Sequence, residues 1–119
     1  MAQPSPTLAK SYAFSLKIVD FCFEIQRTKK EYVLTKQLLK SGTSIGANVE
    51  EATQAQSRND FIAKLSIAQK EAHETRYWLR LMRDSSLQVD QKVIGSLLDD
   101  VQELIRMLNS SLVTAKSKR

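Results

Sequence analysis

Apolar residues recur along most of this chain at steps of three and four, the spacing that places side chains on one face of an α-helix. The longest unbroken row lies in the middle of the chain and consists of Phe61, Leu65, Ala68, Ala72, Thr75, Leu79 and Met82. A second row lies near the C-terminus and consists of Val93, Leu97, Val101, Leu104, Leu108 and Leu112. Together with similar rows nearer the N-terminus, the pattern predicts helices over about residues 8–28, 31–56, 58–84 and 91–115.

Short polar breaks separate these segments, and four long helices with short connections predict an all-α fold, an antiparallel up-down-up-down four-helix bundle over residues 7–115. Both prolines lie in residues 1–6, which we expect to be a disordered lead. Residues 116–119 form a basic tail. Ser57 and Asp90 are candidate N-caps for the third and fourth helices.

The first helical segment carries more apolar surface than one core requires. One row consists of Phe14, Ile18, Phe21 and Ile25, and a second row on another side consists of Tyr12, Leu16, Val19 and Phe23. A helix that faces a single core needs an apolar stripe of only about 100°. The second row therefore predicts packing against another chain, and hence a homo-oligomer.

The stretch from Ser41 to Ala52 has the composition of a loop but keeps the helical spacing of its apolar residues. We predict continuous helix here. An interior glycine costs about 1 kcal/mol relative to alanine, a cost that close approach of another helix would offset. The expected helix-packing residues are Gly42 and Gly46, which would allow the close contact, and Ser41, Ser44 and Asn48, which would form hydrogen bonds across helices.

Several kinds of chemistry lack the residues they need. Gly42 and Gly46 are four residues apart and Ala47 follows, so the phosphate-loop motif is absent. The one histidine, His73, lies two residues after Glu71, whereas a di-iron bundle needs Glu-x-x-His on two helices. The one cysteine, Cys22, lies among apolar residues, where a thiol is an inert small side chain. We therefore expect no metal, no cofactor and no enzymatic activity.

The formal charge of +5 makes an anionic partner plausible. Arginine binds phosphate well through its planar fork. The candidate nucleic-acid-binding residues are the row Arg76, Arg80 and Arg83, the shorter row Lys36 and Lys40, and the tail residues Lys116, Lys118 and Arg119. The alternative is an ordinary solvated surface in which Arg80 pairs with Asp84.

Neither a membrane span nor a signal peptide is expected. No apolar run approaches the ~20 residues that cross a bilayer, and Met1 to Lys10 lacks an apolar signal region. The expected location is the cytoplasm, with no membrane partner.

Two runs of residues resemble a known family, the small four-helix-bundle proteins encoded in intervening sequences of bacterial 23S rRNA genes. The first run is Leu34, Leu38-Leu39 and Ser41-Gly42-Thr43-Ser44-Ile45-Gly46-Ala47-Asn48-Val49-Glu50-Glu51-Ala52. The second run is Ser57-Arg58, Asp60-Phe61-Ile62, Lys64-Leu65, Ile67-Ala68, Lys70-Glu71-Ala72, Glu74-Thr75 and Tyr77-Trp78-Leu79.

The resemblance implies an antiparallel bundle that assembles into a homopentamer. A related protein, the accessory variability determinant of diversity-generating retroelements, is a basic pentamer that binds nucleic acid and a reverse transcriptase. The family offers no established catalytic residues to transfer.

These observations leave three hypotheses. The leading one is a non-enzymatic oligomer that binds nucleic acid, in the form of structured RNA or an RNA–protein complex, through basic surface patches. The second is a protein-interaction scaffold with no nucleic-acid role, and the third and weakest is a small enzyme or metalloprotein.

Overall fold

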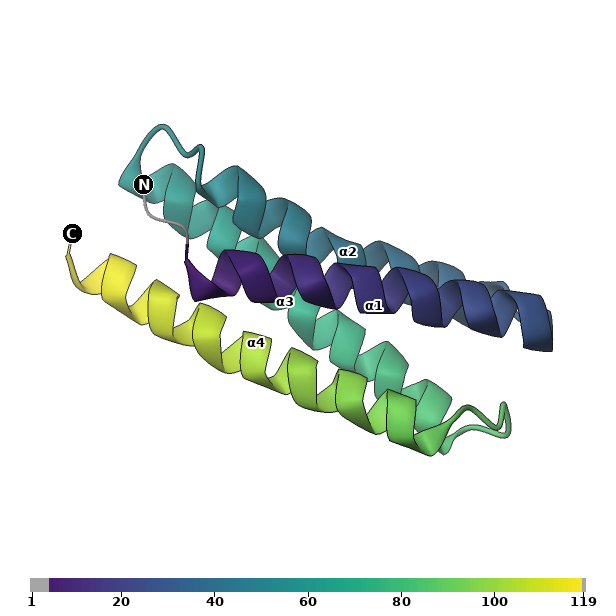
Figure 1. Ribbon diagram of the computed structural model, residues 1–119. Coiled ribbons are helices and arrows are strands. Elements are labelled where there is room, and N and C mark those ends of the chain that lie inside the picture. Colours follow the sequence, from purple (N-terminus) through teal and green to yellow (C-terminus); the bar gives the residue numbers. More distant parts are fainter. Residues whose placement is uncertain (1–4, 119) are drawn as a thin grey trace.

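The computed structural model describes residues 5–118, which form four helices: α1 (Pro6–Lys29), α2 (Val33–Ala52), α3 (Arg58–Asp84) and α4 (Gln91–Ser117). Consecutive helices run in opposite directions (Figure 1). Each helix packs along its two neighbours around the bundle, whereas no Cα atoms of the diagonal pairs α1–α3 and α2–α4 approach within 8 Å in the described chain. The molecule measures 47 × 20 × 20 Å. The predicted all-α four-helix bundle is confirmed.

All four helices contribute large side chains to one core. The fully buried ones include Phe14 and Ile18 from α1, Leu38 and Ile45 from α2, Leu79 and Met82 from α3, and Leu104 and Leu108 from α4. They belong to the rows with helical spacing that the sequence shows, so each helix buries one stripe in the common core.

The chain enters the bundle at Ser5, whose side-chain oxygen accepts a hydrogen bond from the backbone N–H of Leu8, with Pro6 in the first turn. Helix α1 therefore includes Pro6, which the sequence assigned to the lead. The rest of the expected disordered lead falls on residues 1–4, which lie outside the described residues, as does Arg119 of the tail.

Helix α2 is shorter than expected at both ends. It begins at Val33 because the Glu31 carboxylate accepts hydrogen bonds from the backbone N–H groups of Val33, Leu34 and Thr35. It ends at Ala52, whereas the sequence predicts helix to about Gln56. The backbone tightens there, because Gln54 and Ala55 bond to carbonyls only three residues back.

The stretch from Ser41 to Ala52 is continuous helix and packs closely on α1. A Cβ atom added at Gly42 would lie 2.9 Å from Ile18 Cγ2. One added at Gly46 would lie 3.1 Å from Ser15 Oγ and 3.2 Å from the carbonyl oxygen of Ser11. The two glycines thus leave room for the side chains and backbone of α1.

The polar residues of this stretch divide into two kinds. Ser41 is buried and shares a hydrogen bond of 3.0 Å with the hydroxyl of Thr75 on α3. The expected cross-helix hydrogen bonds of Ser44 and Asn48 are wrong. The Ser44 hydroxyl donates to the carbonyl of Lys40 and the Asn48 amide donates to the carbonyl of Ser44, both within α2. Such bonds to the preceding turn satisfy short polar side chains locally.

Candidate nucleic-acid interface

Three arginines line one groove between α3 and α4. Arg76, Arg80 and Arg83 follow one another at steps of four and three, which places them on one face of α3. Leu98, Asp99 and Gln102 form the α4 side of this arginine groove, whose volume is about 420 Å³. The antiparallel packing of α3 on α4 is what turns a row on one helix into a groove with two walls.

The arginines differ in the partners they have. Arg76 donates a hydrogen bond of 2.9 Å to the side-chain oxygen of Gln102, which holds it against α4. Arg83 pairs with the neighbouring Asp84 through a contact of 2.7 Å, and this hydrogen bond lowers the pKa of Asp84 below its ordinary value. Arg80 has no hydrogen bond or ion pair with another described residue. Asp84 forms its ion pair with Arg83 where the alternative interpretation expected Arg80, although the nearby charge of Arg80 also lowers the pKa of Asp84.

The groove keeps a surplus of positive charge, since its three guanidinium groups face one lining carboxylate, Asp99, and Asp84, which pairs with Arg83. A guanidinium offers five N–H donors in a planar fork that matches two phosphate oxygens. Arg80 is exposed and keeps all of its donors for a ligand. The groove can therefore bind phosphate groups spaced along a chain.

The other predicted basic residues lie elsewhere. Lys36 and Lys40 are exposed on α2, the helix diagonal to α4. Lys116 and Lys118 lie at the far end of α4, about 20 Å along the helix from Gln102. In one chain the predicted basic residues therefore form three separate groups.

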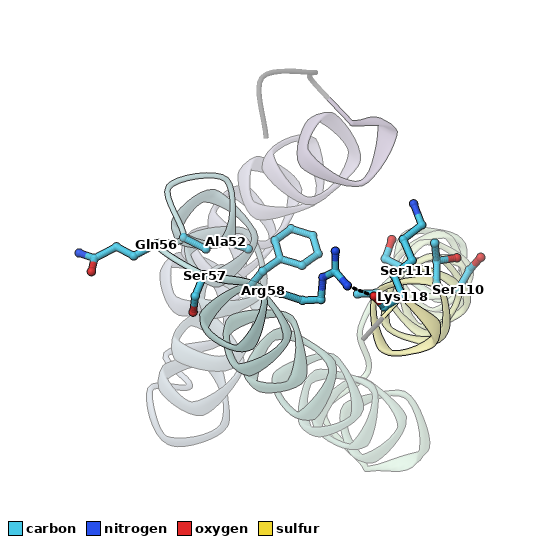
Figure 2. Close-up of a pocket in the computed structure, with 11 residues that line it drawn as sticks. Ala52, Gln56, Ser57, Arg58, Ser110, Ser111 and Lys118 are labelled. Carbon is cyan, nitrogen blue, oxygen red and sulfur yellow. Dashed lines mark hydrogen bonds between the residues drawn. The ribbon is translucent and has the colours of Figure 1, made fainter.

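A second cavity, of about 540 Å³, opens at the end of the bundle where α2 leads into α3 and α4 ends. Figure 2 shows Arg58 reaching from α3 to Lys118, whose backbone carbonyl accepts a hydrogen bond from the guanidinium. The lining residues are Ala52, Ala55, Gln56, Ser57, Arg58, Phe61, Ser110, Ser111, Thr114, Ala115 and Lys118. In the sequence, Ser57 and Arg58 mark the start of a helix and belong to a run that resembles the family, and nothing in the pattern indicates that α4 ends beside them.

Three of the four residues in the second apolar row of α1 are exposed in the single chain, and the fourth, Val19, is half-buried. Tyr12 is 63% exposed, Leu16 53% and Phe23 55%. Buried Phe14 and Ile18 lie on the other side of the same helix. The structure thus shows two apolar sides on α1, of which only one is covered within the chain.

Other residues with potential chemistry have structural surroundings. Cys22 is buried and its thiol donates to the carbonyl of Thr35. Burial first, and the charge of Glu31 second, raise the pKa of this thiol to about 12, so it stays protonated and unreactive. Across residues 5–118 no three side chains of the His, Cys, Asp or Glu type lie where they could share a metal ion. None of the helices in this part of the chain is long and apolar enough to cross a bilayer.

Comparisons with known proteins agree with this architecture. A structure with a TM-score of 0.86 and 44% sequence identity covers 89% of this chain and 97% of its own. It is a protein of unknown function from the S23 ribosomal protein family of Bacteroides thetaiotaomicron. The comparison with curated proteins gives no match. The family model of the 23S rRNA-intervening sequence protein matches residues 6–110, and neither description names an enzymatic activity. The chain therefore belongs to the family of 23S rRNA-intervening sequence proteins.

Proposed function

We propose that this protein is a non-enzymatic homo-oligomer that binds structured RNA, or an RNA–protein complex, through the arginine groove. The observation that carries the proposal is the convergence of Arg76, Arg80 and Arg83 on one groove, in which Arg80 has no hydrogen bond or ion pair with another described residue. RNA is the proposed ligand because guanidinium groups along one groove suit the phosphates of a nucleic acid, and the cytoplasm is the place where we propose that the protein acts.

Contacts of arginine with phosphate supply affinity without reading sequence, and they release counterions from the nucleic acid. One groove with three arginines is a small site. Several copies around a ring would bind one RNA with a higher overall affinity than one copy can. The resemblance stated above implies five copies, and the exposed apolar row of α1 offers a surface through which they would associate.

The test is a mobility-shift titration of a structured RNA over a range of salt concentrations. We expect Arg80→Gln to weaken binding about three- to tenfold, and to lower the dependence on salt by about one counterion per copy engaged. The matched control is Arg27→Gln, which removes the same charge from an exposed arginine that pairs with Glu24 on α1. Lys36→Gln and Lys40→Gln, tested separately, report whether the α2 row takes part.

Two results would contradict the proposal. One is no detectable binding of RNA at low salt, and the other is an equal loss of affinity in the Arg80 and Arg27 variants. The first result would leave the oligomer in place and remove its nucleic-acid role.

A second candidate function, a protein-interaction scaffold, is favoured by the same apolar row, because Tyr12, Leu16 and Phe23 together expose a large apolar face. If that face binds a different protein, the purified chain stays monomeric and the partner binds in a fixed ratio after nuclease treatment. If the chain forms a homo-oligomer, the face is already covered by another copy.

A further inference from the structure

The cavity at the α2–α3 turn combines an apolar floor with a basic rim. The small side chains of Ala52, Ala55 and Ala115 leave the space, and the partly buried Phe61 borders it. Arg58 and Lys118 bring positive charge to the rim. The volume of about 540 Å³ lies within the range of small-molecule sites, about 300–1,000 Å³.

The positive charges of Arg58 and Lys118 are not neutralised by carboxylates of the residues that line the cavity. None of the described residues that line it is acidic. Asp60, close by in sequence, accepts a hydrogen bond from the backbone N–H of Gln56 and so is engaged in the turn. The cavity between α1 and α4 differs, since its lysines Lys17, Lys29 and Lys92 are matched by Asp20, Glu24 and Asp90. Of these two cavities, the one at the α2–α3 turn is therefore suited to an anion.

The guanidinium group of Arg58 at the rim is held in place by one hydrogen bond, and most of its N–H donors stay free. The bond from Arg58 to the carbonyl of Lys118 spans the gap between α3 and α4 (Figure 2). It uses one of five guanidinium N–H donors. The hydroxyls of Ser110 and Ser111 have no hydrogen bond with another described residue. The site thus offers free donors beside an aromatic ring and an apolar floor.

We propose that this cavity binds a nucleoside monophosphate unit, with the base against Phe61 and the phosphate on Arg58 and Lys118. Bases stack on aromatic side chains whatever their sequence, and guanidinium groups bind the phosphate that follows. The sugar would then lie toward α4, where Ser110 and Ser111 are among the lining residues. Such a unit is either a free nucleotide or an unpaired nucleotide of an RNA. The site is separate from the arginine groove and adds to the proposed function.

The experiment is a titration of the full chain with adenosine monophosphate, followed through the backbone amide signals of Ala55, Arg58, Phe61 and Ser111 in NMR spectra. We expect saturable shifts at these residues, and inorganic phosphate to bind about tenfold more weakly because it lacks the base.

Arg58→Gln should weaken binding about tenfold. Phe61→Leu, which keeps an apolar side chain but removes the ring, should weaken it about five- to tenfold. Arg27→Gln should leave it unchanged, and thermal melting checks that each variant is folded.

Two RNA duplexes, one blunt and one with a single unpaired 3′ nucleotide, distinguish a free nucleotide from an unpaired nucleotide of an RNA as the ligand. If the protein prefers the duplex with the unpaired end and Arg58→Gln abolishes this preference, the ligand is an unpaired nucleotide of an RNA. If the free nucleotide binds and neither duplex uses this cavity, the ligand is a free nucleotide. The proposal is overturned if the nucleotide gives no saturable shifts, if Arg27→Gln weakens binding as much as Arg58→Gln, or if phosphate alone binds as tightly as the nucleotide. Arg80→Gln tests the arginine groove independently, because it should weaken duplex binding and leave nucleotide binding unchanged.

Discussion

Two glycines, Gly46 in α2 and Gly95 in α4, show that one residue type can have different roles in the same bundle. Gly46 faces the backbone of α1 at Ser11, and even a Cβ atom there would lie only 3.2 Å from the Ser11 carbonyl oxygen, closer than an ordinary contact. Gly95 in α4 has no atom within 4 Å of the position a Cβ would take. Gly46 therefore allows α2 to pack closely on α1. Gly95 has no such role, and it lowers the stability of α4 because glycine has a low helix propensity.

This contrast gives a matched pair of substitutions. Gly46→Leu should lower the free energy of unfolding by about 2–3 kcal/mol or more, because α1 and α2 must separate to accommodate the side chain. Gly95→Leu should raise it by up to about 1 kcal/mol, because leucine is the better helix former. Urea unfolding followed by circular dichroism measures both. Similar effects of the two variants would show that α2 does not depend on close contact at Gly46.

At this scale, contacts that follow from side-chain size were predictable from the sequence. The hydrogen-bond partners of polar side chains were not. The close approach at Gly42 and Gly46 was predictable because two glycines four residues apart share one helix face. The hydrogen bonds of Ser44 and Asn48 were not predictable. Both side chains reach their own preceding turn as easily as a neighbouring helix, and only the three-dimensional arrangement decides between the two.

At the scale of the elements, the helix starts are set by particular side chains. The Asp90 carboxylate accepts bonds from the backbone N–H groups of Lys92 and Val93 at the start of α4. Glu31 performs the same role for α2 from outside the helix, through three backbone N–H groups. Desolvation alone would raise the pKa of Glu31, but these hydrogen bonds outweigh it and lower the pKa below its ordinary value of 4.5.

A lowered carboxyl pKa stabilises the folded state above the pKa of the unfolded chain, and this stabilisation is lost as the pH falls through the folded pKa. Glu31→Gln should therefore cost about 1 kcal/mol at neutral pH, as the loss of a helix cap does. The difference from the unmodified protein should shrink as the pH drops below about 4.5 toward the lower folded pKa. Chemical unfolding at neutral pH and in acid measures it. The surface residue Glu24, changed to Gln, is the control, and a difference that does not depend on pH would contradict the role of the carboxylate charge.

The existence and type of all four helices follow from the spacing of apolar residues, but the end of α2 does not. Residues 53–56 are Thr-Gln-Ala-Gln, which no helix rule forbids. The helix stops because its last carbonyls bond three residues ahead and because Ser57 begins the next helix. Boundaries of this kind depend on how the chain turns back to pack.

At the scale of the whole molecule, position around the bundle decides which basic residues can act together. A helical wheel shows that Arg76, Arg80 and Arg83 share a face, and the structure adds α4 as the opposite wall. The wheel cannot show that Lys36 and Lys40 lie on the helix diagonal to α4. It also cannot show that Arg58 meets the end of α4. The arginine groove was therefore predictable in part, and the cavity at the α2–α3 turn was not.

The exposed row of α1 allows a test of assembly that leaves the fold intact. Leu16→Lys should convert the proposed oligomer to monomers, because a charge would be buried in the interface. The helical content should stay the same, since Leu16 is 53% exposed in the single chain. Light scattering and circular dichroism measure the two properties. Ser66→Lys adds the same charge at an exposed position of α3, away from the apolar row of α1, and should leave the mass unchanged. A monomeric mass for the unmodified protein at micromolar concentration would contradict the oligomer.

The burial of Cys22 has a practical consequence. It is the only cysteine in the chain and has no exposed surface, because it lies between α1 and the first turn of α2. A thiol reagent can reach it only when these two helices separate. The rate of modification under native conditions therefore reports how often this pair opens, and no cysteine has to be introduced or removed for the measurement. Comparing that rate with and without RNA would show whether a ligand bound on α3 and α4 also holds α1 in place.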